Sequence, residues 1–324
     1  MYFWQSKSIV NYALLPFSYI YHFCGILRKI FASSIKLPAK TICIGNITVG
    51  GAGKTQVAIW LGSKLQQAGF KCVVISKGYK GKLKTPKIVE KEDAARVVGD
   101  EAKEISQFIQ TISSNKIKNT YKLLNAIKPD VIIVDDGMQS PYFHKDYTIL
   151  VVDQDRLFGN NLLFPAGPLR ESINKGAQKA DCVVFVGNKD ISQNQAIPVL
   201  DKHTRNRSVY NARIEPNMQI NTNIRYYAFC GIGNADRFFK TLKIAGLLVV
   251  ETKKFMDHCQ YKDSDIKSML IEAKAINAEL ITTRKDIVKI SAAFPIKCFE
   301  VKLVIKNEDD LLKDIYEKIS IIKH

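Results

Sequence analysis

The fold can first be read from residues 40–55, which run K-T-I-C-I-G-N-I-T-V-G-G-A-G-K-T. The apolar run at 40–46 predicts a buried strand, and the pattern at 54–68 predicts a helix. The small residues between them let successive backbone N–H groups point at anionic oxygens, and a helix N-terminus favours negative charge. The stretch therefore predicts a loop that holds a nucleotide's phosphates.

This loop departs from the general pattern G-x-x-x-x-G-K-[ST] only at its first position, where Thr48 replaces glycine. In the pattern, the lysine reaches the terminal phosphates and the final hydroxyl binds Mg2+, which assigns these roles to Lys54 and Thr55. The predicted nucleotide-binding residues are Thr48, Val49, Gly50, Gly51, Ala52, Gly53, Lys54 and Thr55.

A second nucleotide element follows in V-I-I-V-D-D-G-M-Q, residues 131–139. An apolar strand that ends in acids places a carboxylate at the carboxyl edge of the sheet, where it can hold a metal directly or through water. Either Asp135 or Asp136 could take this role. Two acids at a strand end also occur as ordinary turn residues, so this element is informative mainly beside the phosphate loop.

Apolar runs that alternate with amphipathic stretches predict the rest of the fold. The runs at 40–46, 71–79, 130–136, 148–155 and 181–188 are typical of strands buried on both faces. Strand–helix repetition favours an α/β fold of the P-loop NTPase type, with a doubly wound, mainly parallel sheet. An Asn-rich connector at 214–224 precedes further strand-like runs and a helix near 309–322, which predict a second, smaller α/β domain. We expect an N-terminal helix at 1–35, a P-loop domain at 36–220 and a C-terminal domain at 221–324.

Composition and charge restrict the class of protein. The 324 residues are 46% hydrophobic and 24% charged, as in folded globular proteins. Lys and Arg outnumber Asp and Glu by 48 to 31, and the net charge of +17 favours a polyanionic partner: nucleic acid, an anionic membrane surface or phosphorylated substrates. The seven cysteines include no C-x-x-C pair, which fits a reducing, cytoplasmic environment.

The N-terminal stretch at 9–31 is apolar and rich in tyrosine. Pro16, His22 and the pair Arg28-Lys29 interrupt it, and tyrosines favour the headgroup boundary of a membrane over its centre. We therefore expect a membrane-facing interfacial helix or shallow anchor. A helix buried against the rest of the protein is the alternative.

Other nucleotide-binding classes fit less well. V-F-V-G-N-K-D-I at 184–191 approaches the guanine-selecting N-K-x-D sequence of GTPases, but the aspartate position holds Ile191 and Asp190 is one residue early. A metallochaperone lacks its paired Cys or His ligands. A basic nucleic-acid-binding ATPase fits the charge, but the aromatic residues are not interleaved with basic ones as stacking on bases requires.

Two further segments suggest what accepts a phosphate. Residues 95–105 place Asp100 and Glu101 at the start of a predicted helix, where one acid could act as general base and the other as metal ligand. A helix cap with a first-turn acid is the structural alternative. A Gly/Pro-rich loop at 158–172 carries Arg170, which could stabilise a transferring phosphate or simply lie on the surface.

Several short motifs occur together along the chain: TVGGAGKT (48–55), SKGY (76–79), VGDE (98–101), DDGMQ (135–139), LFPAGPLRES (163–172), AFCGIGN (228–234), FMDHCQY (255–261) and TTRKDIVK (282–289). In this order they resemble the tetraacyldisaccharide 4'-kinase family, whose enzymes make lipid A. The resemblance covers nearly the whole chain. It implies ATP-dependent phosphorylation of the 4'-hydroxyl of a tetraacylated glucosamine disaccharide 1-phosphate, with ATP and Mg2+.

The resemblance also implies roles for particular residues. It makes Asp100 and His258 a catalytic pair, with Arg170 near phosphate; Thr55, Glu101 and either Asp135 or Asp136 would lie near Mg2+. His258 belongs to the predicted C-terminal domain, so the two domains would have to close over ATP. Departures from the family's usual residues are Lys77 for Arg, Cys259 for His and Arg284 for Glu, which bear on affinity and not on reaction class.

The implied partners are an acylated disaccharide lipid and an anionic membrane surface, with no nucleic acid and no obligate protein partner. A tetraacyl lipid does not leave a bilayer readily, so the enzyme has to approach the interface. We expect it at the cytoplasmic face of the bacterial inner membrane, held peripherally or monotopically by the N-terminal helix.

Overall fold

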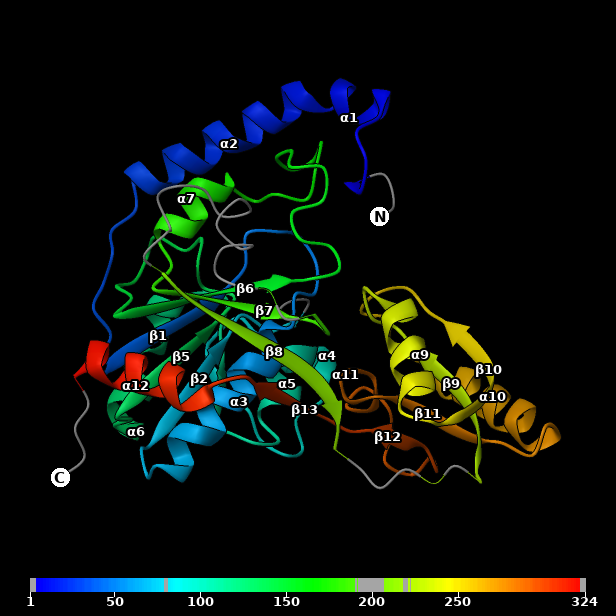
Figure 1. Ribbon diagram of the computed structural model, residues 1–324. Helices are drawn as coiled ribbons and strands as arrows, with labels where there is room; N and C mark the ends of the chain where they lie inside the picture. The colour runs from blue at the N-terminus through cyan, green and yellow to red at the C-terminus, as the bar shows by residue number, and fades with distance from the viewer. Residues whose placement is uncertain are drawn as a thin grey trace. The chain divides into compact units, whose positions relative to one another are not determined.

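The computed structural model describes residues 4–78, 81–189, 191, 207–217, 221 and 223–320. The chain forms two compact units, each built from segments that are distant in the sequence (Figure 1). The first unit comprises Met1–Ser76, Lys116–Ile214 and Leu303–His324, and the second comprises Lys77–Asn115 and Glu215–Lys302. Tyr79, Asp190 and part of the predicted connector at 214–224 lie outside the described residues.

This division differs from the predicted domain boundaries. Residues 77–115, which carry Asp100 and Glu101, belong to the second unit, although they fall inside the predicted P-loop domain. The C-terminal segment from Leu303 belongs to the first unit instead of the smaller domain. The N-terminal residues also group with the first unit. Boundaries placed by composition follow chain order, whereas the units follow packing.

The sheet of the first unit is mainly parallel, as predicted. Its strands, in the order β13-β8-β7-β6-β1-β5-β2, are β13 (Val301–Ile305), β8 (Ser208–Pro216), β7 (Cys182–Val186), β6 (Tyr147–Asp153), β1 (Lys40–Gly45), β5 (Val131–Asp135) and β2 (Cys72–Ser76). The pairings of β1 with β5 and β6, of β2 with β5, and of β7 with β6 and β8 are parallel. The chain changes direction across the sheet beside β1, where α/β proteins bind ligands at the strands' carboxyl ends.

Helices α3 (Lys54–Gln67) and α12 (Glu308–Ile319) pack on this sheet. The unit also contains η2 (Ile117–Thr120), α6 (Tyr121–Ile127) and α7 (Ile173–Gln178). The helix predicted near 309–322 is α12, but it does not close the smaller domain. Its residues Leu311 and Ile315 are fully buried, and Glu308 accepts hydrogen bonds from Trp60 and Lys64 of α3. Its apolar face therefore completes the core of the first unit.

The N-terminal segment consists of α1 (Ile9–Ala13) and α2 (Leu15–Ile30), which together replace the single helical stretch expected at 9–31. Pro16 stands in the first turn of α2, where the missing N–H costs no helical hydrogen bond. The amide of Asn11 donates to the carbonyl of Ala166 at 2.8 Å, and the Ser18 hydroxyl donates to that of Leu163 at 2.9 Å. Among the residues that the structure describes, no helix is both long and apolar enough to cross a bilayer.

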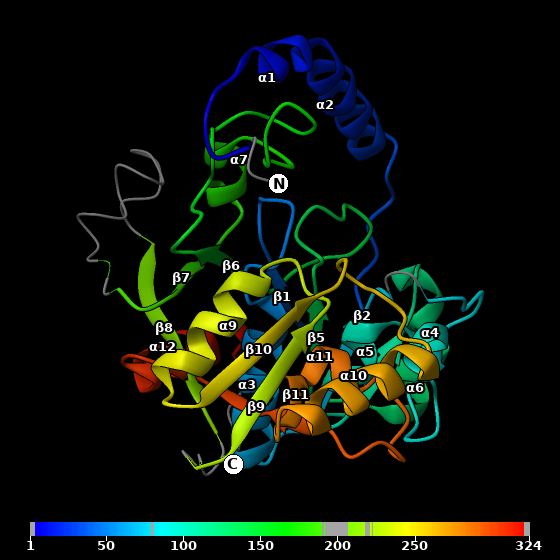
Figure 2. The same ribbon diagram turned by 90° about the vertical axis from the view of Figure 1, so that its right-hand side faces the viewer.

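The second unit contains a four-stranded parallel sheet in the order β10-β9-β11-β12. These strands are β9 (Arg225–Cys230), β10 (Leu248–Lys254), β11 (Glu279–Thr283) and β12 (Lys297–Phe299). Figure 2 shows α9 (Ala235–Ile244) and α10 (Asp263–Ala275) on opposite faces of it. Phe238 and Leu242 of α9 pack on one face, and Ile266 and Met269 of α10 pack on the other. Residues 77–115 add α4 (Ala95–Val98), α5 (Asp100–Ile105) and the antiparallel pair β3 (Lys87–Ile88) and β4 (Thr111–Ser113), and α11 (Arg284–Ile287) contacts α5.

Candidate active site

The predicted phosphate loop connects the end of β1 to the start of α3, a helix of 14 residues. Gly50 and Gly53 have φ angles of +117° and +91°, which residues with a side chain rarely adopt. A Cβ atom at position 53 would also lie 3.2 Å from the Val186 side chain. These two positions require glycine, and the loop ends where the N–H groups of the first turn of α3 are free of helical partners.

Thr48, the departure from the phosphate-loop pattern, has an extended backbone. It forms an antiparallel bridge with Leu169, and the next residue, Val49, donates its N–H to the carbonyl of Pro168 at 2.7 Å. Extended backbone suits a β-branched residue and needs no glycine. The loop at 163–172 therefore lies directly beside the predicted phosphate loop and fixes its first residues.

Lys54 and Arg170 converge on one carboxylate. The Arg170 guanidinium contacts both oxygens of Asp136, at 2.9 and 3.0 Å, and Lys54 Nζ lies 3.5 Å from Oδ1 of the same residue. Lys54 also donates to the side-chain oxygen of Asn46 at 3.1 Å. The structure thus brings Lys54, Asp136 and Arg170 together, and it gives Arg170 a defined partner instead of a free surface position.

The two acids at the end of β5 differ in environment. Asp135 is 1% exposed and ends the strand, whereas Asp136 has a φ angle of +55° and turns its carboxylate toward Lys54. Among the described residues, no group of three or more His, Cys, Asp or Glu side chains is arranged to hold a metal ion. Of the predicted metal ligands, Thr55, Asp135 and Asp136 belong to the first unit and Glu101 to the second.

The second unit contains the predicted catalytic pair. His258 Nδ1 lies 3.0 Å from Asp100 Oδ2, and the two side chains are only 11% and 5% exposed. Asp100 is the first residue of α5, after Gly99 with a φ angle of +93°. His258 itself has a φ angle of +59°, a backbone conformation that costs free energy for a residue of this size. The predicted domain boundary separated these residues, but the structure places both in one unit, so their contact needs no closure of domains.

Lysines of the motif at 282–289 surround this pair. Lys285 Nζ lies 3.4 Å from His258 Nε2 and 3.7 Å from Glu101 Oε1. Lys289 Nζ lies 3.6 Å from Asp100 Oδ2. Lys289 and Lys285, from the other segment of the same unit, therefore balance the charges of Asp100 and Glu101.

Arg284, the reversed charge at the start of this motif, has contacts of its own. It forms an ion pair of 2.6 Å with Glu300, donates to Gln107 at 2.7 Å, and lies 4.9 Å from the centre of the Phe108 ring. None of these three residues is a predicted catalytic or metal-binding residue. Within the unit, Arg284 acts as a packing and ion-pair residue.

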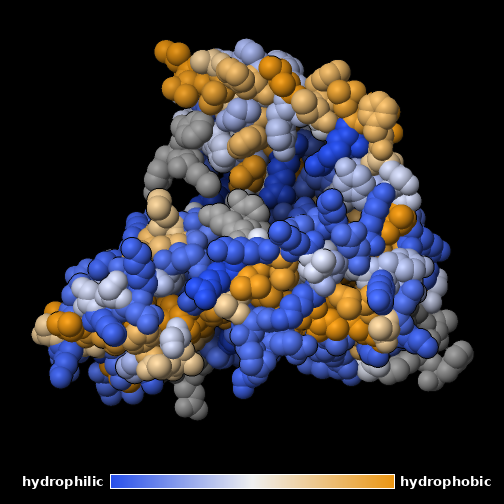
Figure 3. Space-filling view, turned by 180° about the vertical axis from the view of Figure 1, so that it is seen from behind, coloured by the Kyte–Doolittle hydropathy of each residue, from blue (hydrophilic) through white to orange (hydrophobic). Residues whose placement is uncertain are grey.

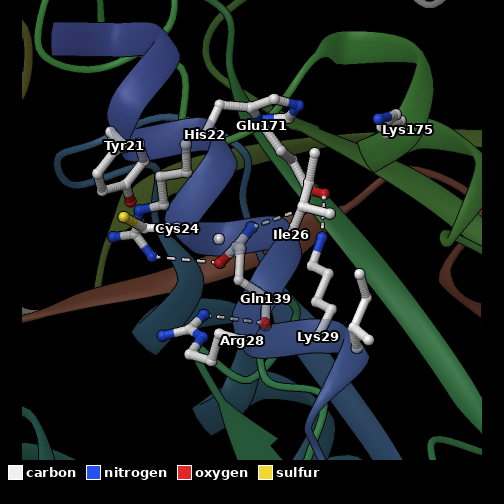
Figure 4. A pocket seen from close by; sticks show the side chains of 12 residues that line it. Tyr21, His22, Cys24, Ile26, Arg28, Lys29, Gln139, Glu171 and Lys175 are labelled. Atoms are coloured by element: carbon white, nitrogen blue, oxygen red, sulfur yellow. Dashed lines mark hydrogen bonds and ion pairs between the residues drawn. The ribbon is translucent and has the colours of Figure 1, made fainter.

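A cavity of about 530 Å3 opens between α2 and the loops that carry Arg170 and Gln139. Figure 4 shows α2 on one side of it, with Arg28 directed at the Gln139 carbonyl (3.4 Å) and Lys29 at Glu171 (3.5 Å). Arg170, Lys175 and His22 also line the cavity. Although burial opposes ionisation of Glu171, the ammonium of Lys179 holds the pKa of that carboxyl below its ordinary value. Its charged lining residues are four cations, Arg28, Lys29, Arg170 and Lys175, and one acid, Glu171.

Several residues around these groups were not assigned a role from the sequence. Asn46, Lys285 and Lys289 contact predicted residues directly. Gln139 accepts a hydrogen bond from Arg170 and bridges the carbonyl of Asn46 and the carboxylate of Glu171. Gln139, Glu171, Lys285 and Lys289 lie inside motifs that the family resemblance had marked. The motifs were therefore a signal, but the contacts that identify these side chains join residues far apart in the sequence.

Comparison with known proteins gives consistent matches. The profile of the family described as tetraacyldisaccharide-1-P 4'-kinase matches residues 10–320. The tetraacyldisaccharide 4'-kinase of Rickettsia bellii is 44% identical over 317 residues, which cover 98% of this chain and 97% of that protein. The enzyme of the same name from Rickettsia canadensis is 45% identical over 322 residues, with the same coverage.

Among solved structures, LpxK from Aquifex aeolicus, crystallised in complex with ATP, superimposes with a TM-score of 0.77 at 27% identity. The alignment covers 96% of this chain and all of that one. The shared fold is α/β with a mainly parallel sheet. Because a family profile matches nearly the full length and relatives above 40% identity cover 98% of the sequence, this chain belongs to the tetraacyldisaccharide 4'-kinase family.

Proposed function

We propose that this protein transfers the γ-phosphate of ATP to the 4'-hydroxyl of a tetraacylated glucosamine disaccharide 1-phosphate, a step of lipid A biosynthesis. It is a lipid kinase by family membership. The observation that carries the mechanism is the buried contact of Asp100 with His258, in a chain that also holds a lysine-bearing glycine loop.

The first unit supplies the nucleotide side of the reaction. The N–H groups of residues 50–55 and the dipole of α3 would hold the phosphates, and Lys54 would leave Asn46 and Asp136 to contact the transferred one. Arg170, held beside Lys54 by Asp136, would stabilise the charge that develops on the equatorial oxygens.

The oxygen groups in this region fit a magnesium site. Thr55 stands at the start of α3, Asp135 ends the neighbouring strand β5, which pairs with β1, and Asp136 follows it. Hydroxyl and carboxylate oxygens are the ligands that Mg2+ prefers. A bound Mg2+ would neutralise charge on the phosphate oxygens.

The second unit supplies the general base. Asp100 would accept the proton of the 4'-hydroxyl. The hydroxyl oxygen would form a bond to the γ-phosphorus while the bond from that phosphorus to the departing ADP breaks. His258 would hold the carboxylate in place through the hydrogen bond at 3.0 Å. Because the glycine loop and Asp100 belong to different units, both have to reach the same substrate during turnover.

The N-terminal segment supports a lipid acceptor. Figure 3 shows hydrophobic side chains gathered along α1 and α2, and Ile9, Phe17, Tyr19, Ile20, Phe23, Ile30 and Phe31 are each at least 58% exposed. We infer that this face enters the headgroup region of the inner membrane at its cytoplasmic surface. The cationic cavity under α2 would take the phosphorylated sugar head of the lipid while its acyl chains remain among the apolar residues.

One assay tests the whole proposal. The purified protein is incubated in detergent–lipid micelles with Mg2+, labelled ATP and the monophosphorylated tetraacyl disaccharide. Label should appear in a bisphosphorylated lipid, and ATP should serve better than GTP. The absence of labelled lipid would overturn the proposal. Equal use of GTP would contradict the preference for ATP, and better use of GTP would make a guanine nucleotide the donor.

A further inference from the structure

Lys289 is a completely buried cation that contacts two acids. Its side chain is 0% exposed, and its Nζ lies 2.8 Å from Asp286 Oδ1 and 3.6 Å from Asp100 Oδ2. Both acids are buried as well, with side chains 0% and 5% exposed. Lysine is almost never buried completely unless it is paired, because the charge loses its hydration. The two carboxylates therefore have to offset the free-energy cost of burying the Lys289 charge.

Asp286 uses its other contacts to shape the backbone. It accepts hydrogen bonds from the N–H of Gly231 at 3.1 Å and from the Thr283 hydroxyl at 2.7 Å. The carbonyl of Gly231 in turn accepts a hydrogen bond from the N–H of His258 at 3.1 Å. Through Asp286, Lys289 is thus connected to the turn that presents the His258 imidazole.

Lys289 also reaches that turn directly, since its Nζ lies 3.5 Å from the carbonyl of Cys259. The turn contains the strained φ angle of His258, so it needs surrounding contacts to keep it in place. The Lys289 ammonium therefore contacts Asp100, the carbonyl of Cys259 and the carboxylate of Asp286. These residues come from the two sequence segments of the second unit.

We infer that Lys289 is a positioning residue that holds the Asp100 carboxylate and the His258 turn in register, an inference that rests on the proposed function. The hydrogen bond from His258 fixes one oxygen of Asp100, and the Lys289 charge attracts the same oxygen from 3.6 Å. Two fixed partners on Oδ2 leave the carboxylate little freedom to rotate. A base that is held in one orientation presents its other oxygen to the hydroxyl without an entropic cost during the reaction.

The alternative is that Lys289 only neutralises Asp286. Three variants separate the two roles: Lys289→Met, Lys289→Met combined with Asp286→Asn, and Lys297→Met as a control. Lys297 lies in the same unit with its side chain 60% exposed. The double variant removes both charges of the buried pair, so it retains the fold even where the single variant leaves Asp286 unpaired and destabilised.

With the full chain, ATP and the disaccharide lipid, we expect the kcat of the double variant to fall about 10- to 100-fold. The KM for ATP should stay within about twofold because the nucleotide loop belongs to the other unit. The control should match the unaltered protein. A double variant that melts like the unaltered protein and keeps its kcat would overturn the inference, because Lys289 would then be a counter-ion of Asp286 alone.

The same change is then made in an Asp100→Asn background. A residue that acts by positioning Asp100 should lower kcat further by less than about twofold there, because its target has lost the charge. An equal loss in both backgrounds would mean a general structural effect and would overturn the inference while the proposed function stands. If Asp100→Asn itself leaves kcat unchanged, the proposed base is wrong and the inference falls with it.

Discussion

The carboxylate of Asp100 and the imidazole of His258 are 3.0 Å apart although 158 positions separate them in the sequence. Their contact arises because residues 77–115 pack with residues 215–302 in one unit. The pair is therefore preformed within that unit.

Replacing Asp100 with asparagine tests the base. The substitution keeps the shape of the side chain but removes its capacity to take a proton, so kcat should fall by about 100- to 10,000-fold. ATP affinity, measured by equilibrium binding, should change by less than about twofold because the nucleotide loop is unaltered. Glu92→Gln, at an exposed position of the same segment, is the matched control. A loss of ATP affinity as large as the loss of kcat would contradict the assignment.

Replacing Lys54 with methionine tests the nucleotide side. The ammonium would contact the transferred phosphate, so kcat/KM for ATP should fall by about 100- to 1,000-fold. Asp136 keeps Arg170 as its partner, which limits the effect on folding. Lys64→Met lies on the same helix and removes only the ion pair with Glu308. If both lysine variants lose activity equally, the charge of Lys54 has no special role.

The membrane assignment is tested on the surface of α2. Phe17 and Ile20, each 59% exposed, are changed together to serine. Burial of an apolar side chain contributes about 1.5–3 kcal/mol, so binding to anionic vesicles, measured by co-sedimentation, should weaken at least about tenfold. Ile271→Ser, at a position of α10 that is 73% exposed, should leave binding unchanged. Undiminished vesicle binding by the α2 variant would refute the anchor.

These point changes are preferable to deletion of the N-terminal segment. Asn11 and Ser18 donate hydrogen bonds to carbonyls of the loop that carries Arg170. A truncated chain would leave those carbonyls without their partners, at about 1–3 kcal/mol for each group that stays buried. Loss of activity on deletion would then mix membrane binding with disorder of the loop.

We expect the buried carboxyl of Glu104 in α5 to make the stability of the fold depend on pH. Burial raises the pKa of this carboxyl from 4.5 to about 7, against an opposing attraction from Lys285. Between these two values the folded protein keeps a proton that the unfolded chain has released, so stability should fall as the pH rises through this window. Glu104→Gln removes the dependence. The free energy of unfolding of the variant should exceed that of the unaltered protein by about 3 kcal/mol at pH 8 and match it near pH 4.5.

Chemical denaturation at the two pH values measures this difference. Glu92→Gln, which removes an exposed carboxylate of the same unit, should show no such pH-dependent gain. An equal stability difference at both pH values would mean that the Glu104 carboxyl does not titrate between them in the folded protein.

The sequence alone determined the local elements of the nucleotide side. Strand β1, the loop and helix α3 were predicted within one or two residues, because an apolar run, glycines at sterically demanding positions and a helical pattern each act over a few neighbouring residues. The buried parallel strands were predicted for the same reason. Ordered motifs identified the family, and the resemblance predicts Asp100, His258 and Arg170 as its site residues.

Only the tertiary structure decided which of these groups meet. Asp100 and His258 belong to one unit and α12 belongs to the other. Arg170 contacts Asp136, and Lys289 is buried between Asp286 and Asp100. Such contacts depend on which apolar faces pack together and on how buried charges find partners. No short stretch of sequence carries that information, because each partner is specified by a segment that lies far away along the chain.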